Sequence, residues 1–158
     1  LDARDGCRDA ILTALILGPV GTGKTHMAAA MFKDLQSDGG AEWITSAALE
    51  RKFRESRNHT DLMERYGDGD VLDDRDELDE GCRYLLLDDL GRATDAQSAE
   101  LYSEIIDRRV SAGLTTVFTS NLTPGLLRKW LGERTYSRLQ FRAVRVVLDG
   151  PDYRTATT

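Results

Sequence analysis

Apolar residues fall along this chain in short continuous runs that alternate with longer segments of helical periodicity. The continuous runs predict strands at residues 12–17, 42–45, 83–87, 115–119 and 143–148. The segments between them, rich in helix-forming residues, predict helices at residues 24–36, 47–56, 61–66, 96–112, 124–131 and 134–139. Strands buried on both faces that alternate with helices are typical of a parallel sheet. The pattern therefore predicts one α/β domain with a parallel sheet flanked by helices.

Turn and capping residues set several of these boundaries. Ser46 is predicted to cap the amino end of the helix at 47–56, because its hydroxyl can accept from a free backbone N–H. The Gly-Asp-Gly-Asp sequence at 67–70 predicts a loop, and Gly113 predicts the end of the long helix at 96–112.

The first apolar run leads directly into Gly18–Thr25, which reads G-P-V-G-T-G-K-T and matches the phosphate-loop pattern G-x-x-x-x-G-K-[ST]. The glycines let the chain curl so that backbone N–H groups point into one cavity, at the amino end of the following helix. Lys24 is expected to reach the β and γ phosphates of ATP, and the Thr25 hydroxyl is expected to hold Mg²⁺. A glycine turn without a ligand is the alternative. The predicted nucleotide-binding residues are Gly18, Pro19, Val20, Gly21, Thr22, Gly23, Lys24, Thr25 and His26.

A second motif, Y-L-L-L-D-D-L-G at Tyr84–Gly91, places two aspartates at the carboxyl end of an apolar run. Ligands of parallel α/β sheets bind at that edge. We predict that Asp88 holds Mg²⁺ beside Thr25 and that Asp89 polarises the attacking water, since hydrolysis of a γ-phosphate depends on positioning and electrostatics. Taken alone, such a run equally suits a strand followed by a turn, and the phosphate loop upstream favours the functional interpretation.

Three later side chains are candidates for the same site. Asn121 follows the next strand and is predicted to bond the attacking water or the γ-phosphate, although Asn-Leu-Thr-Pro also suits a plain turn. Arg134 and Arg138 are four residues apart and therefore share a helix face. One of them is a candidate arginine finger, which would act on a neighbouring subunit and so requires an oligomer; a solvated basic face is the alternative.

Charge is distributed unevenly along the 158 residues, whose net charge is −6. The segment 61–80 carries ten acidic residues against Arg65 and Arg75, and is expected to be a solvated loop or a docking surface for a basic partner. The segment 128–145 reverses this balance, with six basic residues against Glu133, and is a candidate contact for single-stranded DNA.

Composition limits the classes of protein that this chain can represent. No apolar stretch approaches the roughly eighteen residues of a membrane span, so no membrane partner is expected. Cys7 and Cys82 lack the spacing of metal ligands and are predicted to be free thiols in a reducing compartment, which favours the cytoplasm. Because the chain begins with Leu1, we expect residues 1–158 to be one ATPase domain preceded by a partner-binding domain in a longer protein.

These motifs together resemble the AAA+ ATPases of the DnaC and DnaI helicase-loader and IstB transposition-helper family. The similarity extends to four further segments, which read W-I-T-S-A-A-L-E-R-K-F-R-E, T-S-N, L-G-E-R-T-Y-S-R-L and G-P-D-Y-R. The resemblance implies a P-loop NTPase core of AAA+ type with a reduced or absent helical lid. It also implies Walker A contacts at Lys24 and Thr25, Walker B acids at Asp88 and Asp89, sensor 1 at Asn121, an arginine finger at Arg138 ahead of Arg134, and sensor 2 at Arg154.

The function implied by the resemblance is ATP-driven loading of a replicative helicase onto single-stranded DNA, with ATP and Mg²⁺ as ligands and a homo-oligomer formed through the arginine finger. An IstB-like helper of a DNA transposase is the related alternative. A small P-loop phosphotransferase and a module that binds ATP but hydrolyses it poorly are alternatives from other classes.

Overall fold

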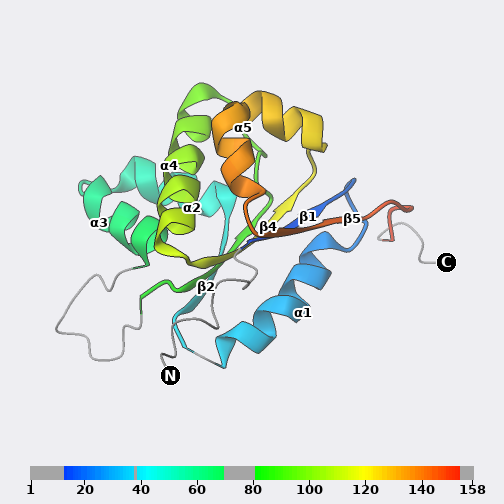
Figure 1. Cartoon of the computed structure of the whole chain (residues 1–158), viewed down its shortest axis with the longest axis horizontal. Helices are drawn as coiled ribbons and strands as arrows, with labels where there is room; N and C mark the ends of the chain where they lie inside the picture. The colour runs from blue at the N-terminus through cyan, green and yellow to red at the C-terminus, as the bar shows by residue number, and fades with distance from the viewer. Residues whose placement is uncertain (1–12, 38, 70–80, 154–158) are drawn as a thin grey trace, which may run out of the picture.

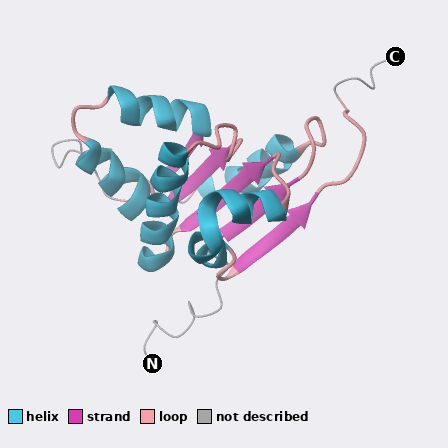
Figure 2. Ribbon diagram, turned by 90° about the horizontal axis from the view of Figure 1, so that it is seen from above, coloured by secondary structure: helices cyan, strands magenta, loops and turns pink. Residues whose placement is uncertain are grey.

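A five-stranded parallel sheet forms the centre of the computed structural model, which describes residues 13–37, 39–69 and 81–153. Every strand pair is parallel (Figure 2). The spatial order of the strands is β2-β3-β4-β1-β5. The strands are β1 (Thr13–Leu17), β2 (Ala41–Thr45), β3 (Tyr84–Asp88), β4 (Thr115–Ser120) and β5 (Ala143–Val147). The predicted parallel sheet flanked by helices is confirmed.

Helices cover both faces of the sheet unequally (Figure 1). One face carries α1 (Lys24–Gln36), and the other carries the remaining helices. These are α2 (Ser46–Glu55), α3 (His59–Met63), the π-helical turn η2 (Glu64–Asp68), α4 (Ala96–Ala112) and α5 (Pro124–Leu139).

Strand β1 shows why apolar residues in the strands do not alternate with polar ones. Leu15 and Leu17 are buried in the core beneath α4 and α5, whereas Ile16 points to the opposite face and packs with Phe32 of α1. Successive side chains of a strand point to opposite faces, so a strand covered on both sides is apolar at every position. Burial on both faces fixes the position of β1, and with it the start of the phosphate loop at the carboxyl end of this strand.

Two predicted boundaries near the edge of the sheet are corrected. Thr45, not Ser46, caps α2, because the Thr45 side chain accepts from the Ala48 N–H at 3.2 Å. Ser46 is the first helical residue and is fully buried, and its hydroxyl donates instead to the Asp89 carbonyl at 2.7 Å. Because Thr45 is the cap, the Ser46 hydroxyl is available to hydrogen-bond the backbone of Asp89, the second residue of the acid pair.

The bounds of the predicted helix at 61–66 are also corrected, as is the first half of the loop predicted at 67–70. Helix α3 begins at His59, and the chain continues into η2, which includes Gly67 and Asp68. Helix α4 favours this continuation, because Arg108 forms an ion pair with Asp68 and the Arg109 guanidinium donates to the Tyr66 carbonyl at 2.9 Å. Residues 70–80, which make up most of the acidic segment 61–80, lie outside the described residues.

Helix α5 joins the two helices predicted at 124–131 and 134–139. Its backbone is non-helical at Gly132, where φ is 80° and ψ is 162°. The kink turns the second half of α5 against α4, with Tyr136 and Leu139 in the core. Between β5 and Tyr153 the structure describes no further helix.

Candidate nucleotide-binding site

The predicted phosphate loop lies between the carboxyl end of β1 and the amino end of α1. Gly23 occupies the N-cap position of α1 with φ at 85°, a left-handed conformation that favours glycine, and no side chain caps the helix there. The first-turn N–H groups of α1 therefore face the loop without a side-chain acceptor, which is the arrangement that binds phosphate at a helix amino terminus.

Lys24 is folded back into the loop. Its side chain is 5% exposed, and Nζ donates to the Pro19 carbonyl at 2.5 Å. The Thr22 hydroxyl donates to the same carbonyl at 2.9 Å. These two bonds close the loop upon itself and hold the ammonium group inside it.

The aspartate at the end of β3 meets the first turn of α1, as predicted. The Thr25 hydroxyl donates to Asp88 Oδ1 at 3.0 Å, with Oδ2 at 3.3 Å. On the other side, the Thr119 hydroxyl donates to Asp88 Oδ1 at 2.5 Å. β4 lies between β3 and β1 in the sheet, and Thr119 near its end therefore provides a second hydroxyl contact to the same carboxylate.

Asp89 has a left-handed backbone, with φ at 62°, which is uncommon for a residue other than glycine. Hydrogen bonds fix both of its peptide groups: its N–H donates to Thr119 Oγ1 at 2.9 Å, and its carbonyl accepts from Ser46 Oγ at 2.7 Å. Such conformations cost free energy and persist where the surroundings hold them, commonly at functional sites. The backbone of Asp89, which directly follows β3, is thus held by Thr119 of β4 and Ser46 of α2.

Asn121 lies directly after β4 and is exposed. The preceding Ser120 is fully buried and anchors this strand end: its hydroxyl donates to the Leu90 carbonyl at 2.6 Å and accepts from the Leu122 N–H at 3.1 Å. The carboxyl ends of β3 and β4 are therefore tied together, and Asn121 emerges at the edge of the sheet that carries Asp88.

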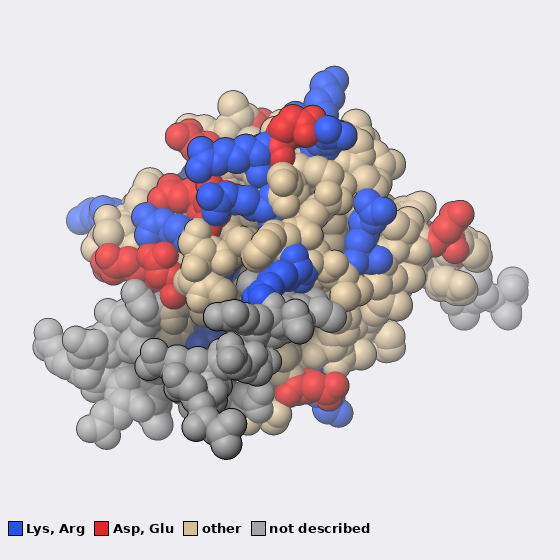
Figure 3. Space-filling model, in the orientation of Figure 1, with Lys and Arg blue, Asp and Glu red and all other residues tan. Residues whose placement is uncertain are grey.

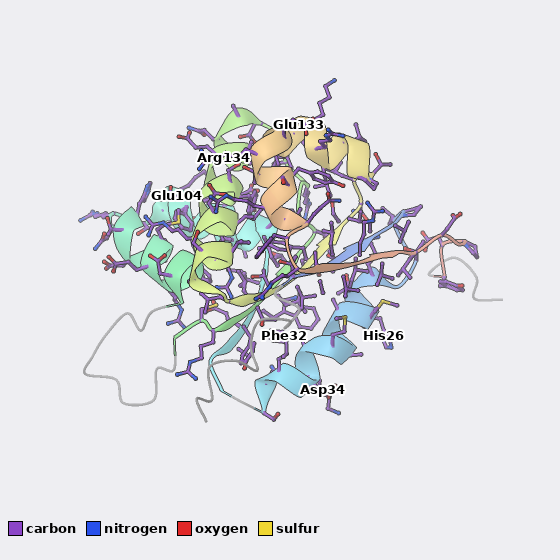
Figure 4. All side chains as sticks on the ribbon, viewed as in Figure 1. His26, Phe32, Asp34, Glu104, Glu133 and Arg134 are labelled. Carbon is purple, nitrogen blue, oxygen red and sulfur yellow. The ribbon has the colours of Figure 1, made fainter. Side chains whose placement is uncertain are left out.

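Arg134 and Arg138 share a helix face, as their spacing predicts, and both contact Asp107 of α4. Arg138 Nε lies 3.2 Å from Asp107 Oδ1, and Arg134 Nη2 lies 3.6 Å from Oδ2. The Arg134 side chain is 79% exposed and that of Arg138 is 36% exposed. In Figure 4, Arg134 lies on the side of the sheet opposite to His26 of α1. The two arginines thus face α4 of their own subunit.

The segment after β5 packs along the phosphate loop. The Leu148 N–H donates to the Leu17 carbonyl at 2.7 Å, and the Tyr153 N–H donates to the Gly21 carbonyl at 3.1 Å. Gly21 has φ at 80°, and a Cβ added there would overlap the Asp152 side chain. Glycine is therefore required at 21 by the chain passing over it as well as by its own backbone. Arg154, the predicted sensor 2 residue, lies outside the described residues.

A cavity of about 470 Å³ lies apart from the phosphate loop, between α2, α3 and α4, and no residue of the loop lines it.

Two further features are absent from the described residues, a cluster of metal ligands and a membrane span. Within the described part of the chain, no group of three or more His, Cys, Asp or Glu side chains is placed to hold a metal ion. Residues 13–37, 39–69 and 81–153 also contain no helix long and apolar enough to cross a membrane. A donor set of one hydroxyl and one carboxylate suits Mg²⁺, which keeps waters and takes its other ligands from phosphates.

Sequence reasoning missed three residues that organise the site. Thr119 and Ser46 hold the acid pair, and Asp107 holds the two arginines. Thr119 stands in the strand-end motif that includes Asn121, but only the strand order, with β4 beside β3, brings its hydroxyl to Asp88. Nothing in the local pattern of α4 distinguishes Asp107 from a solvated acid.

The parallel sheet, the phosphate loop and the acid pair at the end of β3 define a P-loop ATPase domain of the AAA+ type. More specifically, the chain belongs to the AFG1-like ATPase family, whose model matches residues 10–158.

Two curated relatives confirm the predicted relationship to helicase loaders and transposition helpers. The replicative helicase loader DnaC of Escherichia coli K12 is 26% identical over 155 residues, which cover 94% of this chain and 58% of DnaC. The putative ATP-binding protein Rv3427c in an insertion sequence of Mycobacterium tuberculosis is 30% identical, over 92% of this chain and 57% of that protein. The chain thus spans somewhat more than half the length of these relatives.

Solved structures of replication proteins share the fold. The crystal structure of the DnaC helicase loader has a TM-score of 0.65 at 22% identity, covering 87% of this chain and 78% of that chain. The replication initiator DnaA bound to AMPPCP and single-stranded DNA has a TM-score of 0.65 at 18% identity, covering 90% of this chain and 42% of that chain. At these identities the likeness establishes the AAA+ fold alone.

Proposed function

We propose that this chain binds and hydrolyses ATP and uses the cycle to load a replicative helicase onto single-stranded DNA. The observation that carries the proposal is the contact of Thr25 with Asp88, 3.0 Å apart beside Lys24, in a chain similar to DnaC over 94% of its length. The cytoplasmic location and the partner-binding domain upstream expected from the sequence stay predictions.

Each residue of the site has a distinct task in this mechanism. Lys24 exchanges the Pro19 carbonyl for phosphate oxygens when ATP enters the loop, and the N–H groups at the start of α1 take the remaining phosphate oxygens. Asp89 orients the attacking water, and Asn121 at the end of β4 contacts that water or the γ-phosphate. Positioning of this kind supplies most of the catalysis in phosphoryl transfer.

Thr25 and Asp88 are the residues that would hold Mg²⁺. A hydroxyl and a carboxylate already in contact are hard oxygen ligands of the type that this ion prefers. The ion would supply neutralisation of the charge on the phosphates. Thr119 keeps the Asp88 carboxylate oriented from the opposite side.

The arginine finger is proposed to act across a subunit boundary, from Arg138 with Arg134 as the second candidate. Both arginines contact Asp107 of α4, and Arg134 lies on the side of the sheet opposite to His26 of α1 (Figure 4). An arginine so placed reaches the nucleotide of a neighbouring subunit in preference to its own. Completing the site in this way requires a homo-oligomer.

Contact with single-stranded DNA is proposed for the basic end of the chain. Figure 3 shows that Lys and Arg on the face of α4 and α5 are interspersed with Asp and Glu. Three arginines of the segment 128–145 form ion pairs: Arg128 with Glu133, and Arg134 and Arg138 with Asp107. We therefore expect DNA affinity to depend on assembly, which brings several such segments together, and to fall steeply with salt.

A second candidate function is assistance to a DNA transposase. The observation that favours it is the 30% identity to an ATP-binding protein found in an insertion sequence, against 26% to DnaC. Helicase loading and assistance to a transposase would use the same ATPase core. A pull-down with purified helicase and with purified transposase would distinguish the two functions by which partner the chain binds.

ATP hydrolysis measured against protein concentration, with and without single-stranded DNA, tests the proposal. Specific activity is expected to rise with concentration and with DNA. Lys24→Ala and Arg138→Ala should each lose activity, and mixing them should partly restore it, because one variant supplies the intact loop and the other the intact arginine. An arginine finger contributes on the order of 10³-fold or more to the rate.

Arg128→Ala is the matched control, since Arg128 lies on the same helix and also pairs with a carboxylate. It should retain the activity that is measured without single-stranded DNA. Activity that is flat with concentration and unaffected by Arg138→Ala and Arg134→Ala would contradict the trans arginine finger and favour a monomeric phosphotransferase or a passive nucleotide-binding module.

A further inference from the structure

We infer that the cavity between α2, α3 and α4 is a docking site for an arginine side chain on a basic segment of a partner protein. The cavity has a volume of about 470 Å³ and shares no residue with the phosphate loop, so the inference does not depend on the proposed nucleotide function. Its volume is within the range of pockets that hold specific ligands. Its apolar surface, a buried carboxylate and its acidic rim together identify the occupant.

Part of the cavity lining is apolar. Phe53 of α2 and Met63 of α3 are each 7% exposed and belong to the main core, and Leu101 of α4 packs against that core. The Phe53 ring also meets the His59 ring edge-on, with centroids 5.9 Å apart, which joins α2 to α3 beside the cavity. The cavity therefore offers apolar surface to the methylene groups of a long side chain.

The same cavity contains a buried carboxylate. The Glu50 side chain is 10% exposed, and its Oε1 accepts from the Tyr102 hydroxyl at 2.9 Å. Burial and the Glu50 carboxylate raise the pKa of Tyr102, so this hydroxyl stays a donor. The other oxygen, Oε2, lies 3.9 Å from Arg54 Nη1, which is too far for a hydrogen bond, and no described residue donates a hydrogen bond to it.

A charged donor inside the cavity would complete the bonding of Glu50. Buried carboxylates are normally paired, and an oxygen that lacks a donor costs free energy. Arginine matches the site best, because its stem is apolar and its guanidinium presents several N–H donors that bind carboxylates in a planar fork. Arg54 does not supply this bond, since its side chain is 68% exposed and makes no hydrogen bond to Glu50.

The rim extends the match to basic neighbours of that arginine. Four carboxylates and two arginines line the cavity, so its lining is acidic overall. Asp95 and Glu100 are exposed there and form no ion pair with any described residue. Arg108 is shared between Glu104 at 2.9 Å and Asp68. An acidic lining attracts a basic protein segment and repels the phosphates of a nucleic acid or the carboxylate of a free amino acid.

Methionine-methyl NMR with blocked amino acids tests the inference. The chain contains three methionines: Met63 lines the cavity, whereas Met27 and Met31 lie on α1, on the opposite face of the sheet. N-acetylargininamide is expected to shift the Met63 resonance in a saturable way and to leave the other two unchanged. N-acetylcitrullinamide has the same shape without the charge and should bind at least about tenfold more weakly.

Two variants locate the contact. Glu50→Gln should weaken the binding of N-acetylargininamide about tenfold or more, whereas Glu133→Gln, on α5 outside the cavity, is the control and should not change it. The tripeptide acetyl-Lys-Arg-Lys-amide should bind more tightly than N-acetylargininamide, and Glu100→Lys should remove that difference. Because Glu100 is exposed, this variant tests the site independently of how well Glu50→Gln folds.

Three results would overturn the inference. Equal binding of the arginine and citrulline compounds, or no shift of Met63 with either, would show that the cavity does not recognise a guanidinium group. Tighter binding of free arginine than of N-acetylargininamide would assign the cavity to a free amino acid and exclude a partner segment. A shift of Met63 on addition of single-stranded DNA, with none on addition of the tripeptide, would show that the site takes nucleic acid.

Discussion

The Thr25 hydroxyl donates to the Asp88 carboxylate at 3.0 Å, although the two residues are 63 positions apart: Thr25 lies in the first turn of α1, and Asp88 ends β3. β4 lies between β3 and β1, the strand that leads into the phosphate loop, and Thr119 near the end of β4 donates to the same carboxylate. Asp88 is thus fixed by hydroxyl groups from two segments before any ligand arrives, which is the kind of preorganisation that binding of a small hard cation requires.

The first prediction concerns this contact. Thr25→Ala should lower the affinity for Mg²⁺ in the presence of ATP by about 10- to 100-fold, because it removes a ligand and leaves Asp88 with one orienting hydroxyl. Thr25→Ser retains the hydroxyl and should remain close to the unmodified chain. Titration of Mg²⁺ at fixed ATP measures the effect; equal Mg²⁺ affinities for the Ala and Ser variants would contradict it.

Thr119→Val is expected to lower both stability and hydrolysis. The substitution keeps the shape of the side chain but removes the acceptor of the Asp89 N–H and the donor to Asp88. Leaving such groups unsatisfied in a buried position costs about 1–3 kcal/mol. Urea denaturation measures this change, and Thr119→Ser is the control that keeps both bonds. A Val variant as stable as the Ser variant would show that the hydroxyl is not needed.

Arg109 is predicted to be the most sensitive charged residue for folding. Its guanidinium is 1% exposed and donates to four backbone carbonyls and to Thr116 Oγ1. Burial lowers the pKa of this arginine, so the charge is maintained by these bonds. Arg109→Lys cannot reproduce the planar fork and should destabilise the fold by about 3 kcal/mol or more.

The neighbouring residue supplies the control for that experiment. Arg108 pairs with Asp68 and Glu104 at the surface, and Arg108→Lys should change the free energy of unfolding by no more than about 1 kcal/mol. Thermal or chemical denaturation of the two variants side by side tests the difference. Similar losses at both positions would refute the structural role assigned to the buried guanidinium.

Gly132→Ala is expected to destabilise α5, whereas Gly125→Ala in the same helix is not. Neither added Cβ would meet an atom within 4 Å, so sterics with neighbours do not distinguish them. Gly132 has φ at 80° and ψ at 162°, a region almost restricted to glycine, and alanine there costs on the order of 1–3 kcal/mol. Gly125 does not have positive φ, and alanine there should stabilise by about 0.5 kcal/mol. Denaturation midpoints that move together would contradict this explanation of the kink.

The buried thiol of Cys82 is expected to make the folded chain less stable at alkaline pH. Burial raises the pKa of its thiol from 9.0 to about 11. Above pH 9 the unfolded thiol ionises first, so the unfolded state binds fewer protons and the free energy of unfolding falls until the pH passes about 11. At pH 10 the loss from this group is about 1 kcal/mol.

A Cys7→Ser background leaves a single thiol for this measurement. Subtracting the pH profile of a further Cys82→Ala variant removes the contributions of Tyr66 and Tyr102, whose pKa values burial also raises. The difference between the two profiles should decrease between pH 9 and 11. A difference independent of pH would exclude the thiol as the cause.

Much of the fold was predictable because local and global preferences agree. The helices at 24–36 and 96–112 have the predicted boundaries, since each is bounded by residues with clear start or stop chemistry, such as Gly113 with φ at 71°. The predictions that proved wrong, at Ser46 and at Gly67 and Asp68, lie where tertiary bonds compete with local capping and turn preferences. Ser46 binds the Asp89 carbonyl, and Arg108 with Arg109 holds η2.

By itself the sequence determined the chemistry of the site: a phosphate loop after a buried strand, an acid pair after another, and an α/β sheet whose edge carries both. The tertiary structure alone decided which side chains complete it. Strand order brought Thr119 to the carboxylate of Asp88, which Thr25 also contacts. Helix packing gave Arg134 and Arg138 the same partner in Asp107, and the segment after β5 brought the Tyr153 backbone to Gly21. Local propensities act over a few residues, whereas these contacts depend on how distant elements pack, and no periodicity along the chain records that.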